Sequence, residues 1–129
     1  MKKLILVLLV INVSLVSFGQ IIAHKGTHSI ENTLQKLELN CSAEKAYFIA
    51  YKKAVLLDWS FNNTDSKLFV FSATTPKTMK RWDDDVNLYI DAVNENKCII
   101  SIKSKLGHKP NKDYITLYLI SIEEQINMR

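Results

Sequence analysis

Apolar and polar residues alternate along two neighbouring stretches in the second half of the chain. Residues 86–92 are VNLYIDA and residues 98–103 are CIISIK, and this period of two is typical of half-buried strands. A polar turn at residues 94–96 joins them. Opposed residues on paired strands share a face, so apolar residues are expected to lie opposite one another. The resulting register pairs Ile90 with Ile100, Leu88 with Ile102, and Asn87 with Lys103. We therefore predict an antiparallel hairpin, which sets Asp85 opposite Lys105.

Helical periodicity occurs in two segments. Residues 43–57 carry small and apolar side chains three and four positions apart, and Ser42 suits the N-cap of a helix. The small side chains allow this helix to pack closely on a sheet, and a ligand groove beneath the helix is the alternative interpretation. A second apolar stripe in residues 115–126 predicts a final helix, for which Asn111 is a suitable N-cap.

Shorter apolar or aromatic runs at residues 33–40, 59–61 and 68–74 predict further strands, whereas the polar segment 62–67 is typical of a turn. The resulting order is β-α-β-β-β-β-α. One antiparallel sheet with helices on a single face buries the apolar side of every element. The predicted fold class is therefore α+β, with a four- to five-stranded antiparallel sheet and two helices on one face.

The N-terminal segment predicts export. Lys2 and Lys3 precede an uncharged apolar run at residues 4–18, and Ser17 and Gly19 occupy the −3 and −1 positions of a small-x-small cleavage site. This arrangement is typical of a secretory signal peptide. An uncleaved membrane anchor is the alternative, but a spanning helix needs about 20 apolar residues, and this run is shorter.

These signals divide the chain into a signal peptide at residues 1–19, a flexible leader at 20–32 and a single α+β domain at 33–129. The total length of 129 residues suits one domain. We expect the mature protein in the periplasm or outside the cell, with membrane contact only transiently, through its signal peptide. The formal charge of +4 falls to +2 when the two lysines of the signal peptide are removed. This weak charge argues against nucleic acid as a partner.

Cys41 and Cys98 are the only cysteines of the chain. An oxidising compartment permits one disulfide between them. The bond would close a loop of about 57 residues and add roughly 4 kcal/mol by the loop-entropy model. Two buried thiols in adjacent strands are the alternative, because cysteine also packs as a small hydrophobic residue. Two cysteines outside a close motif do not predict a structural zinc site.

Three short motifs occur in an order that resembles a bacterial family. They are Thr74-Thr75-Pro76, Asp84-Asp85-Val86 and Ser104-Lys105-Leu106-Gly107. With the alanine-rich helix before them, residues 42–107 resemble the family catalogued as domain of unknown function 1499. The chain is similar to a divergent member, because Pro110, Tyr114 and Leu117 stand near the places where that family carries an aspartate, an asparagine and an arginine. The family has no assigned activity, so the resemblance implies the fold more than the function.

Three consecutive aspartates, Asp83–Asp85, form the densest charged cluster, and His108 follows the hairpin that approaches them. One interpretation makes these residues metal ligands or an acid–base pair. Adjacent side chains of a strand point to opposite faces, so the three carboxylates do not converge on one ion. No serine or cysteine nucleophile is placed with His108 either. The simpler interpretation is a strand that begins with aspartates paired to Lys105, His108 or Lys109.

Two functional hypotheses follow. The first is a non-catalytic binding module of the cell envelope that binds a protein or a small apolar ligand, without a cofactor or a metal. It would use the loop edge at residues 80–85 together with residues 105–109, where Trp82 is either an exposed anchor or a core residue. The second is a small metal-dependent or acid–base hydrolase that uses Asp83–Asp85 and His108. The short chain and the lack of a placed nucleophile favour the first. Its candidate binding residues are Arg81, Trp82, Asp84, Asp85, Lys105 and His108.

Overall fold

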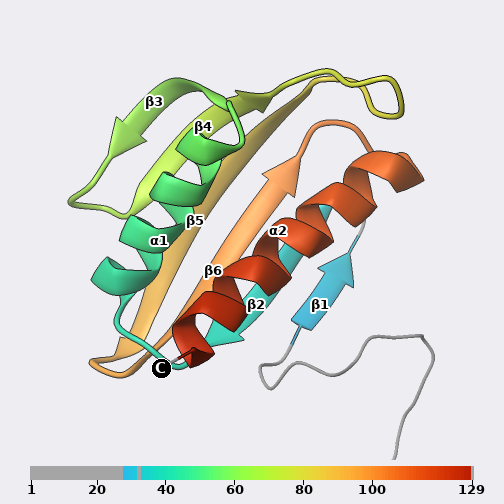
Figure 1. The fold of residues 1–129 in the computed structure, drawn as a ribbon. Coiled ribbons are helices and arrows are strands. Elements are labelled where there is room, and N and C mark those ends of the chain that lie inside the picture. Colours follow the sequence, from blue (N-terminus) through green and yellow to red (C-terminus); the bar gives the residue numbers. More distant parts are fainter. Residues whose placement is uncertain (1–27, 32, 129) are drawn as a thin grey trace, which may run out of the picture.

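The computed structural model describes residues 28–31 and 33–128, and the predicted signal peptide at residues 1–19 lies outside the described residues. In chain order the elements are β1 (His28–Glu31), β2 (Leu34–Leu39), α1 (Ala43–Leu56), β3 (Ser60–Asp65), β4 (Val70–Thr75), β5 (Asp84–Asn94), β6 (Lys97–Ser104) and α2 (Lys109–Asn127). The architecture is α+β, as predicted, and both helices lie against the same face of one antiparallel sheet (Figure 1). Within the described ranges, no helix has the length and apolar character needed to cross a membrane.

The described sheet has six strands rather than four to five, in the order β1-β2-β6-β5-β4-β3. Each neighbouring pair is antiparallel. β5 and β6 form the predicted hairpin, in which Ile90 lies opposite Ile100 and Leu88 lies opposite Ile102. The predicted register is therefore confirmed. It holds because a shift of one residue would turn one strand's apolar side chains away from the helices.

Two predictions are wrong at the edges of the sheet. His28–Glu31 forms β1 and pairs with β2, whereas the sequence placed these residues in a flexible leader. Residues 62–65 belong to β3, and residues 63–65 pair with β4, whereas the polar sequence of this segment predicts a turn. The turn instead lies at residues 66–69. An edge strand pairs through its backbone and leaves most of its side chains in water, so it forms without an apolar pattern.

Local interactions set both ends of α1. The Ser42 hydroxyl accepts a hydrogen bond from the Lys45 backbone N–H at 3.2 Å, as predicted for the N-cap. At the other end, the Trp59 N–H donates to the Ala54 carbonyl oxygen at 3.0 Å, and Asp58 has a φ of 62°. This left-handed residue and six-residue hydrogen bond are those of a Schellman motif. The motif ends the helix and directs the chain into β3.

The final helix, α2, begins two residues before the predicted N-cap. His108 is the N-cap residue, Pro110 lies in the first turn, and Asn111 lies inside the helix. Proline suits the first turn because the N–H groups there have no partner within the helix. The Asn111 side chain is therefore not a cap, and it contacts the loop between β4 and β5 instead.

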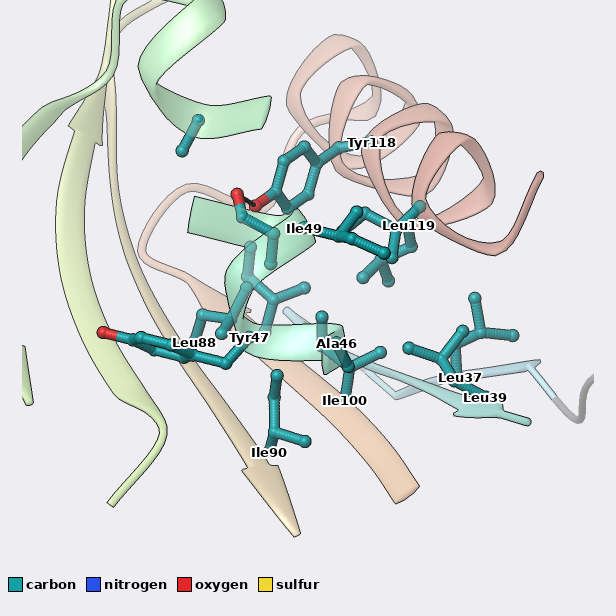
Figure 2. Packing of buried hydrophobic residues seen from close by; sticks show 14 of the residues in the cluster. Leu37, Leu39, Ala46, Tyr47, Ile49, Leu88, Ile90, Ile100, Tyr118 and Leu119 are labelled. Atoms are coloured by element: carbon teal, nitrogen blue, oxygen red, sulfur yellow. Dashed lines mark hydrogen bonds between the residues drawn. The ribbon is translucent and has the colours of Figure 1, made fainter. Parts of the chain in front are cut away.

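The hydrophobic core lies between the sheet and the two helices. Leu37, Leu88 and Ile100 of the sheet belong to the same buried cluster as Ala46 of α1 and Leu119 of α2 (Figure 2). The alanines of α1 that belong to this cluster are almost completely buried. Their small size therefore allows this face of the helix to pack closely on the sheet. Truncating a buried leucine in such a core costs about 2–5 kcal/mol.

Candidate functional site

The loop between β4 and β5, residues 76–83, projects from the end of the sheet at which α2 begins (Figure 1). The connection between β6 and α2, residues 105–108, lies at the same end. The predicted binding residues belong to these two connections or to the strand end between them. The structure thus brings together the two segments that the sequence predicts to form one binding edge.

Asp84 is a buried residue with 3% of its surface exposed. Its Oδ1 accepts hydrogen bonds from the backbone N–H groups of Lys105 and Leu106, both at 3.0 Å. Its Oδ2 accepts one from Asn111 Nδ2 at 3.3 Å, and its own N–H donates to Thr75 Oγ1 at 3.1 Å. The carboxylate therefore joins the start of β5 to the end of β6 and to the first turn of α2.

Inward contacts hold the loop against the domain. Arg81 Nη1 donates to the Pro76 carbonyl oxygen at 2.8 Å, and its guanidinium carbon lies 3.6 Å from the ring centroid of Tyr114. Such a stacked cation and ring attract each other. Asn111 Nδ2 also donates to the Trp82 carbonyl oxygen at 3.2 Å. The Arg81 side chain, a predicted binding residue, thus supports the loop from within.

Six other residues of the loop are exposed, Thr78 and Asp83 among them, and the remaining four are either large apolar residues or lysines. Met79 is fully exposed and Trp82 is 57% exposed, while Lys77 and Lys80 are also exposed. The Lys77 Nζ lies 4.6 Å from the Trp82 ring centroid. We name the surface of these four side chains the tip surface. Lys77 and Met79 are not among the predicted binding residues, although cations and large apolar residues are interspersed in the run KTMKRW at residues 77–82.

The other predicted residues lie beside the tip surface without forming a common centre. Asp85 Oδ1 accepts a hydrogen bond from Thr74 Oγ1 at 2.8 Å. The Lys105 backbone N–H donates to the Asp85 carbonyl oxygen at 3.0 Å, while the Lys105 side chain is exposed. His108 is exposed at the start of α2, and its side chain makes no cap hydrogen bond.

The expected charge pairs of the aspartates do not form. In the part of the chain that the structure describes, neither Lys105 nor His108 makes an ion pair with Asp83–Asp85. Lys109 instead pairs with Asp113 at 2.8 Å, one helical turn further on. Asp84 is buried, and buried polar groups need hydrogen-bond partners. Two backbone N–H groups and the Asn111 amide satisfy its carboxylate in place of the expected cations. Among residues 28–31 and 33–128, no group of three or more His, Cys, Asp or Glu residues is placed to hold a metal ion.

Cys41 and Cys98 are neighbouring buried thiols. The hydrogen bond between the two side chains lowers the pKa of Cys41, against the opposing effect of burial. The same hydrogen bond raises the pKa of Cys98, and burial adds to this effect. The Cys98 Sγ also lies 3.8 Å from the carbonyl oxygen of Ser42, the residue next to Cys41. Both cysteines are free thiols in the structure, and the predicted disulfide stays a prediction.

An open groove of about 700 Å³ lies between α1 and the turn at residues 66–69. Aromatic side chains line it, among them Tyr47 and Phe69, whose ring centroids are 5.9 Å apart. Phe69 has a φ of 59°, a left-handed conformation that is rare for a bulky residue and costs on the order of 1–3 kcal/mol. The sequence offers a ligand groove beneath this helix as an alternative, and the groove in the structure is lined by α1 and by residues 64–69.

Comparison with known protein families and with curated proteins finds no match to this chain. The resemblance of residues 42–107 to the domain of unknown function 1499 family therefore stays a prediction. Inferences about function rest on the geometry of the chain itself.

Proposed function

We propose that the protein is an exported, non-catalytic binding module that attaches to a component of the cell envelope through the tip surface. One observation carries the proposal: Met79 and Trp82 expose large apolar side chains on a loop that hydrogen bonds from Arg81 and Asn111 hold in place. Binding residues are often carried on loops that a rigid scaffold supports, and exposed apolar patches mark interaction sites.

The support of the loop favours binding over simple exposure. Arg81 holds the loop from within through Pro76 and Tyr114. The Thr78 N–H donates to the Arg81 carbonyl oxygen at 2.8 Å and closes the turn that carries Met79. A loop held in this way loses little conformational entropy when it binds, and preorganisation of this kind increases affinity.

The alternative of a small hydrolase has less support from the geometry. The Asp84 carboxylate is buried and accepts three hydrogen bonds from the protein itself. A general base must reach the proton that it removes, and this carboxylate is enclosed by its own partners. Asp83 and His108 are exposed on separate segments. These observations favour a structural role for the aspartates.

Retention in the envelope tests the proposed function. We compare the wild-type protein with the double variant Met79→Ser/Trp82→Ser, both produced with their native N-terminal segment in a bacterial host. The wild-type protein is expected to sediment with the envelope fraction, whereas most of the variant is released into the soluble exported fraction. The readout is quantitative immunoblotting of the two fractions.

Leu68→Ser is the matched control, because Leu68 is an exposed apolar residue in the turn at the other end of β4. The control is expected to distribute like the wild-type protein. An unchanged distribution of Met79→Ser/Trp82→Ser would contradict the proposed binding role of the tip surface. Intact-mass spectrometry of the exported protein tests the expected cleavage after Gly19.

A further inference from the structure

We propose that the tip surface binds an anionic lipid bilayer, with Met79 and Trp82 entering the headgroup region and Lys77 and Lys80 facing the lipid phosphates. This inference rests on the proposed function and names the partner of the same surface. It also goes beyond the expectation that the membrane is contacted only through the signal peptide.

The apolar part of the tip surface suits the boundary between water and lipid. Met79 is fully exposed, and more than half of Trp82 is exposed. Tryptophan favours the membrane interface because its ring is largely apolar while its indole N–H still forms hydrogen bonds. The loop that carries both residues projects beyond the end of the sheet (Figure 1).

The charge of the loop suits an anionic surface. Residues 77–81 contain three cations and no acidic residue. Lys105 and Lys109 follow on the neighbouring connection and at the start of α2. Each lysine or arginine near an anionic membrane contributes about 1 kcal/mol of attraction. Cations that surround exposed apolar side chains combine the two forces that attach proteins to membrane surfaces.

The acidic residues at this end of the molecule offset only part of this charge. Asp84 is buried and hydrogen-bonded to the protein. Asp85 accepts a hydrogen bond from Thr74 and belongs to β5 rather than to the loop. Asp113 pairs with Lys109. Asp83, the last residue of the loop, and Asp85 are both exposed. The three cations of residues 77–81 together with Lys105 exceed these two acidic residues by two.

The choice of cation favours lipid over a protein partner. Protein–protein interfaces are enriched in arginine and depleted of lysine. Here Arg81 stacks on Tyr114 of α2, whereas Lys77 and Lys80 are exposed to solvent. A lysine ammonium is a compact charge on a flexible stem. Such a charge can follow mobile lipid phosphates more easily than it can match fixed groups on a protein surface.

Vesicle binding tests the inference. The purified mature protein is mixed with vesicles of phosphatidylcholine alone and with vesicles that contain equal amounts of phosphatidylglycerol and phosphatidylcholine. Sedimentation measures binding, and tryptophan fluorescence measures insertion. Trp59 is buried and donates to the Tyr114 hydroxyl at 2.7 Å, so a blue shift on binding reports on Trp82. We expect binding and a blue shift with the anionic vesicles only, and release by salt because screening weakens exposed charges.

Two double variants separate the tip surface from charge in general. Lys77→Gln/Lys80→Gln is expected to weaken the vesicle partition coefficient roughly 30-fold, from two lysine contributions. The matched control is Lys45→Gln/Lys67→Gln, which removes two exposed cations from α1 and from the turn between β3 and β4. The control is expected to bind like the wild-type protein. Trp82→Phe should abolish the blue shift while most of the binding remains.

Three results would overturn the inference: no binding to anionic vesicles, equal binding to neutral vesicles, or equal binding by Lys77→Gln/Lys80→Gln. Envelope retention that depends on the tip surface, combined with absent vesicle binding, would indicate a protein partner and leave the proposed function intact. Absence of both would contradict the proposed function as well.

Discussion

At the scale of single residues, Asp84 belongs to a run of aspartates that suggests metal binding or acid–base catalysis, but its buried, hydrogen-bonded carboxylate favours a structural role. It was singled out as one of three consecutive aspartates, and its neighbours Asp83 and Asp85 share its charge but not its burial. The difference arises because Asp84 points to the helix-facing side of β5, where Leu106 and Asn111 supply donors. Adjacent positions of a strand face opposite sides, so identical residues acquire different roles.

Replacing Asp84 tests this role. In the wild-type protein, three N–H donors meet the Asp84 carboxylate. Asp84→Asn replaces one carboxylate oxygen with an NH2 group, which cannot accept, so at least one hydrogen bond is lost. We expect the free energy of unfolding to fall by about 1–3 kcal/mol, as for other buried groups that lose a partner. Urea unfolding followed by circular dichroism measures this change. Asp83→Asn, at an exposed position, is the control and should be close to neutral; equal stability of both variants would contradict the structural role of Asp84.

A second prediction at this scale concerns Tyr118. Its hydroxyl donates to the Ala50 carbonyl oxygen at 2.6 Å, and burial raises the pKa of Tyr118 well above the ordinary value of 10.0. Because the folded-state pKa is the higher one, the stabilisation is fully present below about pH 10 and is lost as the pH rises towards the folded-state pKa. Above pH 10, the free energy of unfolding of the wild-type protein should fall with pH because of Tyr118, by up to about 1.4 kcal/mol per pH unit. Tyr118→Phe lacks the titrating hydroxyl, so this part of the fall should be absent from the variant.

Urea unfolding of both proteins between about pH 8 and pH 11 measures this difference. Burial also raises the pKa of Tyr47. Tyr47 is present in both proteins, so the difference between the two pH profiles reports on Tyr118. Parallel profiles would contradict the prediction.

At the scale of helices and strands, predictions succeeded where local or alternating patterns decide the structure. α1 begins after Ser42 as predicted, because a hydroxyl near the first N–H groups acts within one turn of chain. The register of β5 and β6 follows from alternation along both strands. The edge strand β3 and the start of α2 were missed, because a polar edge strand and a helix that begins with His108 carry little local signal.

The contact between β6 and the segment before α1 carries the third prediction. Oxidation of Cys41 and Cys98 by a disulfide-exchange oxidant would form one S–S bond; the two thiols lose two protons, and their two electrons reduce the oxidant's disulfide to two thiols. Cys41 is the expected first thiolate because its pKa is lowered by the Cys98 hydrogen bond. The bond is expected to add roughly 4 kcal/mol to the free energy of unfolding by the loop-entropy model.

Intact-mass spectrometry with and without reduction, after alkylation of free thiols, detects the bond. Urea unfolding with and without reductant measures its contribution, and the Cys41→Ser/Cys98→Ser variant is the control, which reductant should not affect. Full alkylation of both cysteines in the exported, denatured but unreduced protein would contradict the disulfide.

At the scale of the whole molecule, β1 extends the described sheet to residues before the predicted start of the domain at residue 33. It pairs with β2 and thereby covers the backbone of a strand that would otherwise be an edge of the sheet. A chain that begins at Thr33 lacks β1, and we expect it to unfold more easily by at least about 2 kcal/mol, since several hydrogen bonds are lost. The uncovered edge should also favour self-association.

Chains that begin at Gln20, His28 and Thr33 test this prediction. The first two are expected to be alike in urea unfolding and monomeric by size-exclusion chromatography with light scattering. Only the chain from Thr33 should be destabilised, and only its measured molecular mass should rise with protein concentration. If the chain from Thr33 matched the other two, the predicted boundary at residue 33 would describe the domain better than β1 does.

The sequence by itself determined the α+β class, the central hairpin and the extent of α1, because each follows from residues that are close in the chain or alternate regularly. It also located the loop that carries Trp82. The tertiary structure alone decided that Arg81 turns inward onto Tyr114, that Met79 stands in solvent, and that Asp84 is enclosed. Those outcomes depend on which distant segments meet at one end of the sheet, and no local pattern carries that information.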